Sequence, residues 1–314
     1  MKKFGFGIIG CGVISKWHAF AIKDIEGAEL IGAYDRNTMS VTDFCMKNGC
    51  RVFATTQELL ACKDIDVVCI CTPSGTHASL VVEAANAGKH IIVEKPMAIT
   101  RQQLKDVVEA VEKNNVQLTA ISQRRFSEAV QKTKKAIEDG ELGRLLMGDI
   151  YMKFYRSPEY YASAGWRGTW EMDGGGALMN QGIHGIDILQ YLMGPVKTVS
   201  AVCKTLDRDI EVEDAAVAIV EYENGAIGVI EGTTCITPGY LMRTEIHGTK
   251  GTIILEGEKI ARWDVDGKNL AEKSCGTENK SFQDPTAFAI ESHKQQFMDF
   301  LDALRNGTKP LVDV

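Results

Sequence analysis

A lysine at the end of a short apolar segment is the first residue in this chain that could do chemistry. Lys95 follows Glu94 and precedes Pro96, and together they close segment 90–93, whose β-branched residues predict a buried strand. In an open α/β sheet, ligands bind beyond the carboxyl ends of the strands. Lys95 is therefore a candidate cationic group beside a ligand, although a surface turn would also explain a Lys-Pro pair.

A second set of polar residues lies on a segment that predicts an apolar helix, residues 176–193. Asn180, His184 and Asp187 follow one another at intervals of four and three residues, so at 3.6 residues per turn they share one face. Buried polar groups without partners cost roughly 1–3 kcal/mol each. This polar stripe is either a structural hydrogen-bond network or a substrate-facing surface on which His184 accepts a proton near neutral pH.

An aromatic segment upstream could bind a sugar. Trp166 and Arg167 lead into residues 168–170, which end in Trp170. Aromatic faces stack on sugar rings, and a guanidinium binds hydroxyl, carboxylate or phosphate groups through its planar fork. The tryptophans could instead pack a loop onto the core. We expect Trp166 and Arg167 to contact a substrate.

The N-terminal part of the chain predicts the scaffold that such residues need. Segment 4–9 predicts a strand, and a glycine-rich turn and a helix follow. Gly10 allows a tight turn, and Gly12 lets the backbone approach a pyrophosphate, which then lies on the N–H groups that open the helix. Ser15 replaces the third glycine of the fingerprint, and its side chain would crowd the contact between helix and strand. The predicted pyrophosphate contacts are Gly10, Cys11, Gly12, Val13 and Ile14.

The end of the second predicted strand bears on the choice of cofactor. Asp35 follows segment 28–34, and an acidic residue there can accept hydrogen bonds from the adenosine ribose and repel a 2′-phosphate. We therefore expect NAD. NADP stays an alternative cofactor because of Arg36, since a guanidinium beside Asp35 could hold a 2′-phosphate. A helix or turn cap is the structural alternative for Asp35.

The periodicity predicts two domains of different character. Strands alternate with helices up to residue 123, which indicates right-handed crossovers and a parallel sheet; beyond it the strands become longer and more alternating. We predict an α/β protein with an N-terminal Rossmann dinucleotide-binding domain (residues 1–123) and a C-terminal α+β domain (residues 124–314) with a large, mostly antiparallel, open sheet. The strands expected in the second domain are 145–154, 196–204, 215–222, 226–234, 242–248 and 251–256.

Several motifs together resemble the Gfo/Idh/MocA oxidoreductases, the family of glucose–fructose oxidoreductase and inositol dehydrogenase. They occur in the family's order from residue 4 to beyond residue 190. The resemblance implies a dinucleotide-dependent enzyme with a second domain whose open sheet face commonly pairs with another subunit, as a homodimer or homotetramer. The motifs are Gly10-Cys11-Gly12, Cys71-Thr72-Pro73 to His77, Glu94-Lys95-Pro96, Gln123-Arg124-Arg125-Phe126, and Gly174-Gly175-Gly176 to Asp187.

The resemblance also implies roles for individual residues. In the family the lysine of Glu-Lys-Pro lies beside the nicotinamide and orients the reacting hydroxyl, a role that we expect for Lys95. Inositol-dehydrogenase-like members carry an aspartate four residues before the histidine; Asn180 stands there and can bind a sugar but cannot be a base, which leaves His184 as the general base. Further cofactor contacts are expected at Thr72, Pro73, Ser74, His77, Glu94, Lys95 and Gln123.

The expected activity is hydride transfer between a hydroxyl-bearing carbon of a sugar, sugar nucleotide or polyol and nicotinamide. Residues 168–170 and 176–181 look most like the branch that oxidises the 3-hydroxyl of nucleotide-linked sugars or glycosides. Two alternatives stay open: a glycosidase that uses NAD transiently to oxidise C3, and a non-enzymatic dinucleotide-binding regulator.

The composition and the chain ends argue against several other classes of protein. The formal charge of −7 argues against a general nucleic-acid or acidic-membrane binder, and no apolar segment reaches transmembrane length. The N-terminus leads into a strand rather than a signal peptide. Nine cysteines without a C-x-x-C pair indicate reduced thiols of a cytoplasmic protein, and we expect no metal site. Family members usually continue into a further helix after a segment such as 307–314, so either the chain is truncated or this helix was lost.

Overall fold

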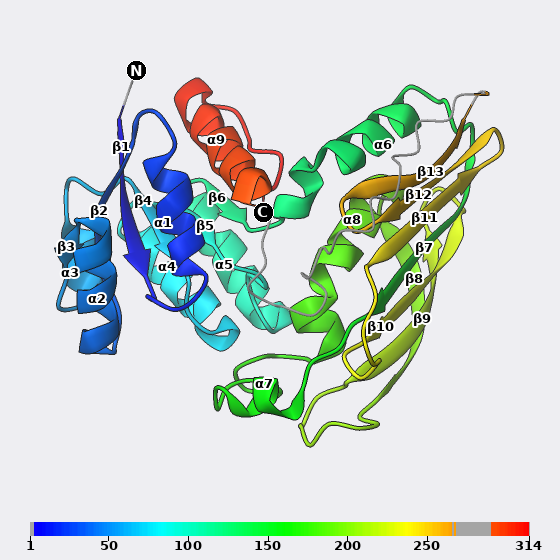
Figure 1. Ribbon diagram of the computed structural model, residues 1–314. Helices are drawn as coiled ribbons and strands as arrows, with labels where there is room; N and C mark the ends of the chain where they lie inside the picture. The colour runs from blue at the N-terminus through cyan, green and yellow to red at the C-terminus, as the bar shows by residue number, and fades with distance from the viewer. Residues whose placement is uncertain (1–2, 266, 268–289, 314) are drawn as a thin grey trace. The chain divides into compact units, whose positions relative to one another are not determined.

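The protein forms two compact units, which Figure 1 draws as a ribbon. The computed structural model describes residues 3–265, 267 and 290–313. The first unit comprises Met1–Gln123 and Ala289–Val314, and the second Arg124–Phe288. The division after Gln123 coincides with the predicted boundary, but the predicted second domain of residues 124–314 includes α9 (Ile290–Asn306), which belongs to the first unit.

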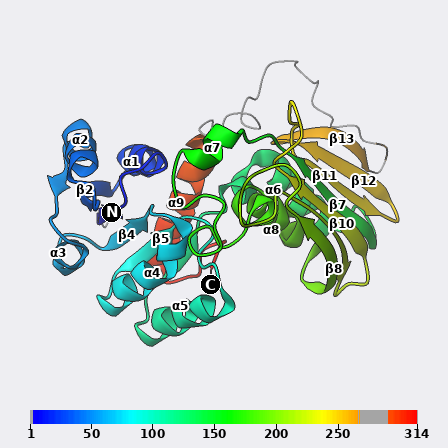
Figure 2. The same ribbon diagram turned by 90° about the horizontal axis from the view of Figure 1, so that it is seen from below.

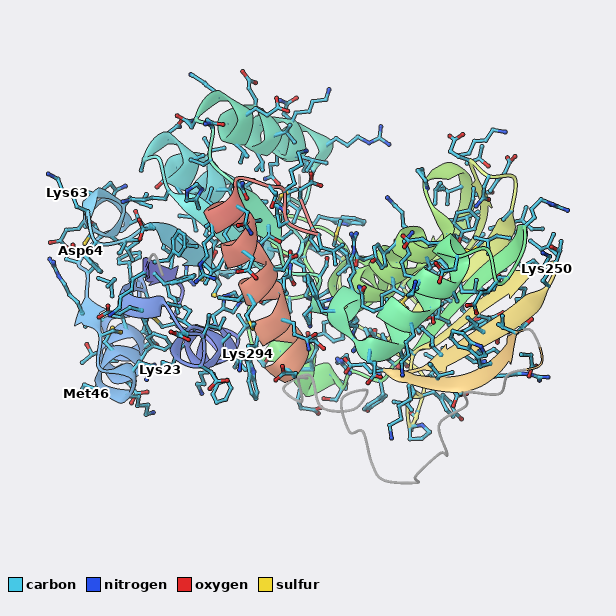
Figure 3. All side chains as sticks on the ribbon, turned by 90° about the horizontal axis from the view of Figure 1, so that it is seen from above. Lys23, Met46, Lys63, Asp64, Lys250 and Lys294 are labelled. Carbon is cyan, nitrogen blue, oxygen red and sulfur yellow. The ribbon has the colours of Figure 1, made fainter. Side chains whose placement is uncertain are left out.

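The apolar face of α9 explains why this helix returns to the first unit. Phe297 and Phe300 are fully buried in the same hydrophobic cluster as Phe6 and Ile22, and Phe297 stacks on Phe6 with ring centroids 6.2 Å apart. At the edge of this contact Lys294 forms an ion pair with Asp24, just after α1 (Ser15–Lys23); Figure 3 labels Lys294 and the neighbouring Lys23.

The first unit contains the predicted Rossmann sheet. Its six strands are all parallel and lie in the order β3-β2-β1-β4-β5-β6, which is the order of a dinucleotide-binding domain. Each residue of β4 is buried, as expected for a strand covered on both faces. The strands are β1 (Phe4–Ile9), β2 (Ala28–Tyr34), β3 (Arg51–Val52), β4 (Val67–Ile70), β5 (His90–Val93) and β6 (Leu118–Ala120).

Helices cover both faces of this sheet. The hydrophobic cluster on one face takes residues from α1, α2 (Thr38–Asn48) and α9, and the cluster on the other takes them from α3 (Thr56–Ala61), α4 (His77–Asn86) and α5 (Arg101–Lys113). Figure 2 shows α4 and α5 side by side. Thr55 and Thr100 cap α3 and α5 as their spacing to Glu58 and Gln103 predicts.

The second unit is built on a seven-stranded sheet in the order β13-β12-β11-β7-β10-β9-β8. All neighbours pair antiparallel except β7 and β10, which are parallel. This confirms the predicted mostly antiparallel sheet and adds β13 to the expected strands. The strands are β7 (Leu145–Lys153), β8 (Val196–Lys204), β9 (Ala215–Tyr222), β10 (Ile227–Thr233), β11 (Arg243–Gly248), β12 (Gly251–Glu256) and β13 (Lys259–Val265).

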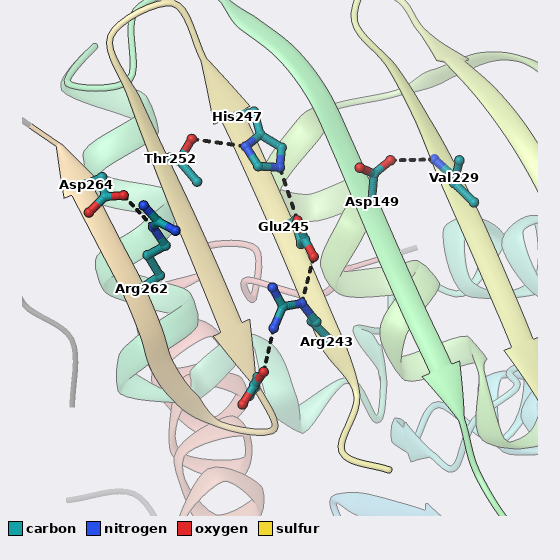
Figure 4. A network of polar contacts seen from close by, with 9 residues as sticks. Asp149, Val229, Arg243, Glu245, His247, Thr252, Arg262 and Asp264 are labelled. Carbon is teal, nitrogen blue, oxygen red and sulfur yellow. Dashed lines mark hydrogen bonds and ion pairs between the residues drawn. The ribbon is translucent and has the colours of Figure 1, made fainter. Parts of the chain in front are cut away.

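One face of the second sheet is packed and the other is open. Residues of α6 (Glu128–Glu138) and α8 (Ile183–Met193) share a hydrophobic cluster with the sheet. Along β9 and β10 the side chains alternate between this cluster and the opposite face, whereas every residue of the edge strand β8 is exposed. Figure 4 shows polar side chains of the open face, among them Arg243, Glu245 and His247. The short helix α7 (Pro158–Ala162) lies in the loop after β7.

None of the helices in the described ranges combines the length and the apolar character needed to cross a membrane.

Candidate active site

The glycine-rich turn after β1 has the backbone geometry that its sequence predicts. Gly10 has a φ of +93°, and a Cβ atom built on it would lie 2.7 Å from the carbonyl oxygen of Cys71. Gly12 is exposed, and among the residues that the structure describes, none outside its immediate chain neighbours has an atom within 4 Å of a Cβ built there. The turn therefore requires glycine at its first position for backbone packing, and is open to a ligand at Gly12.

Within the described ranges, no side chain caps the N–H groups at the start of the helix after this turn. Ile14 occupies the N-cap position of α1 and makes no capping hydrogen bond. Ser15 is fully buried, and its Oγ donates to the carbonyl oxygen of Gly12 at 2.7 Å. The serine that replaces the third glycine thus helps to close the turn. An uncapped helix N-terminus with an exposed glycine beside it fits a pyrophosphate.

Asp35 connects the end of β2 to the glycine-rich turn. Its Oδ2 accepts a hydrogen bond from the backbone N–H of Cys11 at 2.7 Å, and its Oδ1 accepts one from Asn37 at 2.7 Å. Asn37, not Asp35, caps the following helix α2. Each carboxylate oxygen retains a second lone pair, so Asp35 can brace the turn and still accept from a ribose hydroxyl. The exposed Arg36 follows it.

The loop after β4 is joined to the loop after β5 through His77. Thr72, Pro73 and Ser74 lead into a 3₁₀ turn (Ser74–Thr76). The ring of His77 is 1% exposed; its Nδ1 lies 2.7 Å from the carbonyl oxygen of Pro96, and its Nε2 lies 2.7 Å from that of Thr72. Burial lowers the pKa of His77 despite these two carbonyls. The structure thus gives His77 a bracing role between the two loops.

The side chain of Glu94, a predicted cofactor contact, is buried against α1. Its Oε1 lies 2.9 Å from Nε2 of His18 on α1, and both side chains are buried. Burial by itself would raise the pKa of Glu94, but the hydrogen bond and charge of His18 outweigh it and lower this pKa to about 2. The backbone N–H of Lys95 donates to Oε2 of Glu94 at 3.3 Å. The glutamate therefore anchors the turn that carries the half-buried Lys95.

Gln123 adds an unpaired acceptor to the first unit. The residue is 5% exposed, and within the part of the chain that the structure describes its Oε1 has no hydrogen-bond partner. A buried acceptor of this kind fits a ligand donor such as a carboxamide N–H. With the open turn at Gly12 and the uncapped start of α1, the residues of this unit fit a dinucleotide.

In the second unit, the predicted helix 176–193 is interrupted. Ala177–Gln181 form a π-helical turn, closed by a 2.8 Å hydrogen bond from Gly182 N–H to the carbonyl oxygen of Ala177, and α8 begins at Ile183. The carboxylate of Glu213 accepts from the N–H groups of Gly176 and Leu178 at 2.8 and 2.9 Å. The expectation of one continuous helix is wrong at its start, because this distant carboxylate organises the first turn. π-turns often occur at functional sites.

Asp187 has a structural partner. Both of its oxygens accept from the guanidinium of Arg125, at 2.8 Å from Nε and 2.6 Å from Nη2. The guanidinium also lies over the ring of Tyr191, 5.0 Å from its centroid. For this member of the polar stripe, the structural interpretation left open by the sequence is the one that the contacts favour.

Asn180 lies beside a carboxylate that the sequence did not draw attention to. Its Nδ2 donates to Oδ1 of Asp173 at 2.8 Å, and Oδ2 of Asp173 accepts the backbone N–H of Gly168 at 2.9 Å. Asp173 is 2% exposed. The one available signal was its position directly before the glycine run 174–176. His184 is half-buried in the first turn of α8.

Trp166 and Arg167 form a stacked pair held by a tyrosine. The guanidinium of Arg167 lies over the ring of Trp166 at 4.6 Å and over that of Tyr160 at 4.2 Å. Its Nη1 donates to the hydroxyl of Tyr160 at 2.5 Å, and Nε2 of Gln181 donates to the same hydroxyl at 3.1 Å. Arg167 is therefore fixed in position near the π-helical turn.

Two cavities lie in the second unit. One of about 510 Å³ borders the predicted substrate loop and is lined by Tyr161, Arg167 and Arg208, with Asp209 and Glu211 also on its wall. The other, of about 800 Å³, lies on the open sheet face, and residues of β7 and β11 form part of its lining. None of the predicted site residues is among the residues that line it. The smaller cavity is thus the one beside the candidate substrate residues.

The described residues contain neither a cluster of metal ligands nor a disulfide. Among the described residues, no group of three or more His, Cys, Asp or Glu side chains is placed to hold a metal ion. Eight of the nine cysteines lie in described ranges, and all eight are free thiols. Burial raises the pKa of Cys69 and of Cys71 well above its usual value, so these two are unreactive core residues.

Each of the two units matches a known protein family. Residues 4–122 match the oxidoreductase family with an NAD-binding Rossmann fold, and residues 130–254 match the GFO/IDH/MocA C-terminal domain. Inositol 2-dehydrogenase of Rhizobium meliloti (strain 1021) is 30% identical over 261 residues, which are 81% of this chain and 76% of that protein.

Solved structures are similar over the full chain. The WlbA dehydrogenase from Bordetella pertussis, in complex with NADH and UDP-GlcNAcA, is 35% identical with a TM-score of 0.88, over 99% of this chain and 91% of that one. Levoglucosan dehydrogenase, in complex with NADH and L-sorbose, is 25% identical with a TM-score of 0.86, over 100% of this chain and 92% of that one.

Proposed function

The chain belongs to the Gfo/Idh/MocA family and is an NAD-binding oxidoreductase, and we propose that it transfers a hydride between nicotinamide and a hydroxyl-bearing carbon of a nucleotide-linked sugar. The resemblance expected from the motifs is thereby confirmed, together with the predicted fold class and cofactor. The narrower choice of a sugar nucleotide is supported above all by the likeness to WlbA, which covers 99% of this chain and was solved with NADH and UDP-GlcNAcA.

Lys95 and His184 have the catalytic roles in this proposal. Bound NAD supplies the hydride acceptor. An imidazole nitrogen of His184 takes the proton of the reacting hydroxyl, which is the work of a general base. The ammonium group of Lys95 stabilises the negative charge that develops on the hydroxyl oxygen. Glu94 and its buried partner His18 hold the turn that carries Lys95.

Trp166, Arg167 and Asn180 bind the substrate in this proposal. The guanidinium of Arg167 is positioned by Tyr160 on the wall of a cavity of about 510 Å³, a size within the range of small-molecule sites. Arginine suits phosphate and carboxylate groups. Asn180, held by Asp173, offers hydrogen bonds to a sugar hydroxyl.

A substrate panel tests this function. NADH formation would be followed with NAD and UDP-GlcNAcA, UDP-GlcNAc, myo-inositol or levoglucosan, and we expect kcat/KM for one nucleotide-linked sugar to exceed that for the free compounds at least about tenfold. Turnover of the free compounds alone would rule out the sugar nucleotide. Cleavage of a glycoside without net NADH would indicate the NAD-dependent glycosidase instead, and NAD binding without any turnover would indicate a regulator.

We infer further that the open face of the second sheet packs against a second copy of the chain. Val217, Ile219 and Ile227 on this face are 50%, 64% and 51% exposed, and contiguous exposed apolar surface marks interaction sites. Further along this sheet, beyond β7, lies a network in which Arg243 binds Glu245 and Glu256, each at 2.6 Å (Figure 4). Light scattering should give the mass of a dimer or tetramer for the wild type and a smaller mass for Ile219→Asp. A monomeric wild type would refute the inference.

A further inference from the structure

A buried carboxylate ties two candidate substrate segments together. Asp173 is 2% exposed. Its Oδ1 accepts from Nδ2 of Asn180 at 2.8 Å, and its Oδ2 accepts from the backbone N–H of Gly168 at 2.9 Å. One side chain therefore joins the loop that carries Arg167 to the π-helical turn that carries Asn180.

The carboxylate decides how the amide of Asn180 is turned. An ionised carboxylate only accepts hydrogen bonds. If the amide were reversed, its Oδ1 would face Oδ1 of Asp173, and two acceptors at hydrogen-bond distance repel each other. Nδ2 therefore stays toward Asp173, and Oδ1 of Asn180 points away from the carboxylate. A hydrogen bond with one ionised partner is roughly twice as strong as a neutral one, so the pair holds this orientation.

We propose that Asp173 is a positioning residue for the reaction, because it fixes Asn180 so that the amide presents its carbonyl oxygen as an acceptor to the substrate hydroxyl. The inference rests on the proposed function. Inositol-dehydrogenase-like members of the family have an aspartate where Asn180 stands, and a carboxylate presents an acceptor in either orientation. An asparagine does so only if a neighbour sets its orientation, and Asp173 is that neighbour.

Asp173→Asn reverses the orientation of the amide. The new side chain has one acceptor oxygen and one NH₂ group in place of two acceptor oxygens. The oxygen satisfies the buried N–H of Gly168, since a buried backbone donor is costly to leave unpaired. The NH₂ group then faces Asn180, whose amide turns to accept from it and so presents its own NH₂ group to the substrate. A donor replaces the acceptor.

The double variant Asp173→Asn/Asn180→Asp restores the acceptor. The new amide at position 173 serves Gly168 with its oxygen and donates to one oxygen of the new carboxylate at position 180. The second carboxylate oxygen then takes the place of the Asn180 carbonyl oxygen. Asn180→Asp alone leaves two carboxyl groups side by side, which must share a proton or repel each other.

The activity test is a double-mutant cycle with the sugar of the panel that the wild type turns over. Asp173→Asn should lower kcat/KM about 10- to 100-fold, with the KM for NAD unchanged. The double variant should recover to within about fivefold of the wild type, because coupled residues compensate each other. Asp149→Asn is the matched control: its carboxyl is also buried in the second unit and accepts the N–H of Val229 at 2.8 Å. Its kcat/KM should stay within about twofold of the wild-type value, provided that light scattering gives it the same oligomeric mass as the wild type.

Two results would overturn the proposal: Asp173→Asn within about twofold of the wild type, or a double variant no more active than the weaker single variant. Circular dichroism and thermal melts establish that each variant is folded. If Asp173→Asn does not fold, the comparison of the double variant with Asn180→Asp still decides, because positioning requires the double variant to be the more active.

A spectroscopic test is independent of any substrate. In protein labelled with ¹⁵N-asparagine, the side-chain signal of Asn180 is assigned by its loss in Asn180→Asp. One of its two amide protons should be shifted downfield and protected from solvent exchange. Rapid exchange of both protons would contradict the pair and overturn the proposal. If the wild type oxidises no sugar, the proposed function fails, and the signal still decides whether Asp173 holds Asn180.

Discussion

The two units hold their candidate functional residues in different ways. In the first unit, Gly10, Asp35 and Lys95 each follow a strand of one parallel sheet, so backbone topology brings them to its carboxyl edge. In the second unit, Asn180 depends on side chains that come from other segments of the chain. Glu213 organises the π-helical turn that carries Asn180, and Asp173 orients the amide of Asn180.

The difference indicates where each unit tolerates substitution. A position set by a sheet survives changes of neighbouring side chains, because the strands are stabilised by many backbone hydrogen bonds and buried apolar groups. A position set by one or two carboxylates is lost with a single substitution, because a buried polar group without its partner is costly. Chemistry in the first unit should therefore fail only when the reacting group itself is removed, whereas chemistry in the second should also fail through supporting residues.

His184 is the residue whose replacement should lower kcat the most. His184→Ala should lower kcat about 10²–10⁴-fold, the usual range for a positioned proton-transfer group. Wild-type activity should rise with pH as the imidazole loses its proton, because only the neutral ring accepts one. The measurement is a pH profile of kcat for both proteins. Turnover within a few-fold of the wild type would assign the whole polar stripe to structure, as the contacts of Asp187 already do for that residue.

Lys95 tests the first unit at its reacting group. Lys95→Ala should lower kcat about 10²–10³-fold, as removal of a charge-stabilising donor does in other enzymes. NAD affinity, measured by fluorescence titration, should stay near the wild-type value, because the pyrophosphate contacts come mainly from backbone N–H groups. A large loss of NAD affinity together with normal kcat would make Lys95 a cofactor anchor and not a catalytic residue.

Glu94 tests whether the first unit also contains a side-chain support. A hydrogen bond to a charged group contributes about 1.5–3 kcal/mol, so Glu94→Gln, which keeps the shape but removes the charge, should be less stable than the wild type by up to about this amount at neutral pH. The pKa of Glu94 is lowered from 4.5 to about 2 in the folded protein. A lowered pKa stabilises the fold above the unfolded value and loses that effect as pH falls through the folded value. The difference in unfolding free energy, measured with urea, should therefore be full at neutral pH and vanish between about pH 4.5 and pH 2. A difference that does not change with pH would contradict the role of the His18 contact.

Asp35 should have the smallest effect. The wild type should prefer NAD, and Asp35→Ala with Arg36 left in place should improve kcat/KM for NADP about tenfold, or about 1.4 kcal/mol, by removing charge repulsion. Use of NAD should fall only modestly, since the turn keeps its glycine geometry. A wild type that prefers NADP tenfold or more would show that Arg36 decides the choice of cofactor.

Much of the first unit could be predicted from its sequence, because each feature depends on a short sequence pattern. The β-branched segment before Glu94 predicts a buried strand, and the alternation of strands with helices then predicts a parallel sheet with Lys95 at its carboxyl edge. Thr55 and Thr100 cap their helices through residues three positions away. Gly10 needs positive φ for a turn between adjacent elements. Each of these features depends on a few neighbouring residues.

Only the tertiary structure decided the partners of the buried polar groups and the place of the last helix. Asp187 pairs with Arg125, 62 residues away, and Glu213 caps the N–H of Gly176, 37 residues away; no local pattern specifies such pairs. The apolar face of α9 fits a core in either unit by its sequence, and its contact with α1 selected the first. A periodic pattern shows that a group must be buried or paired, whereas its partner depends on which distant segments the complete fold brings together.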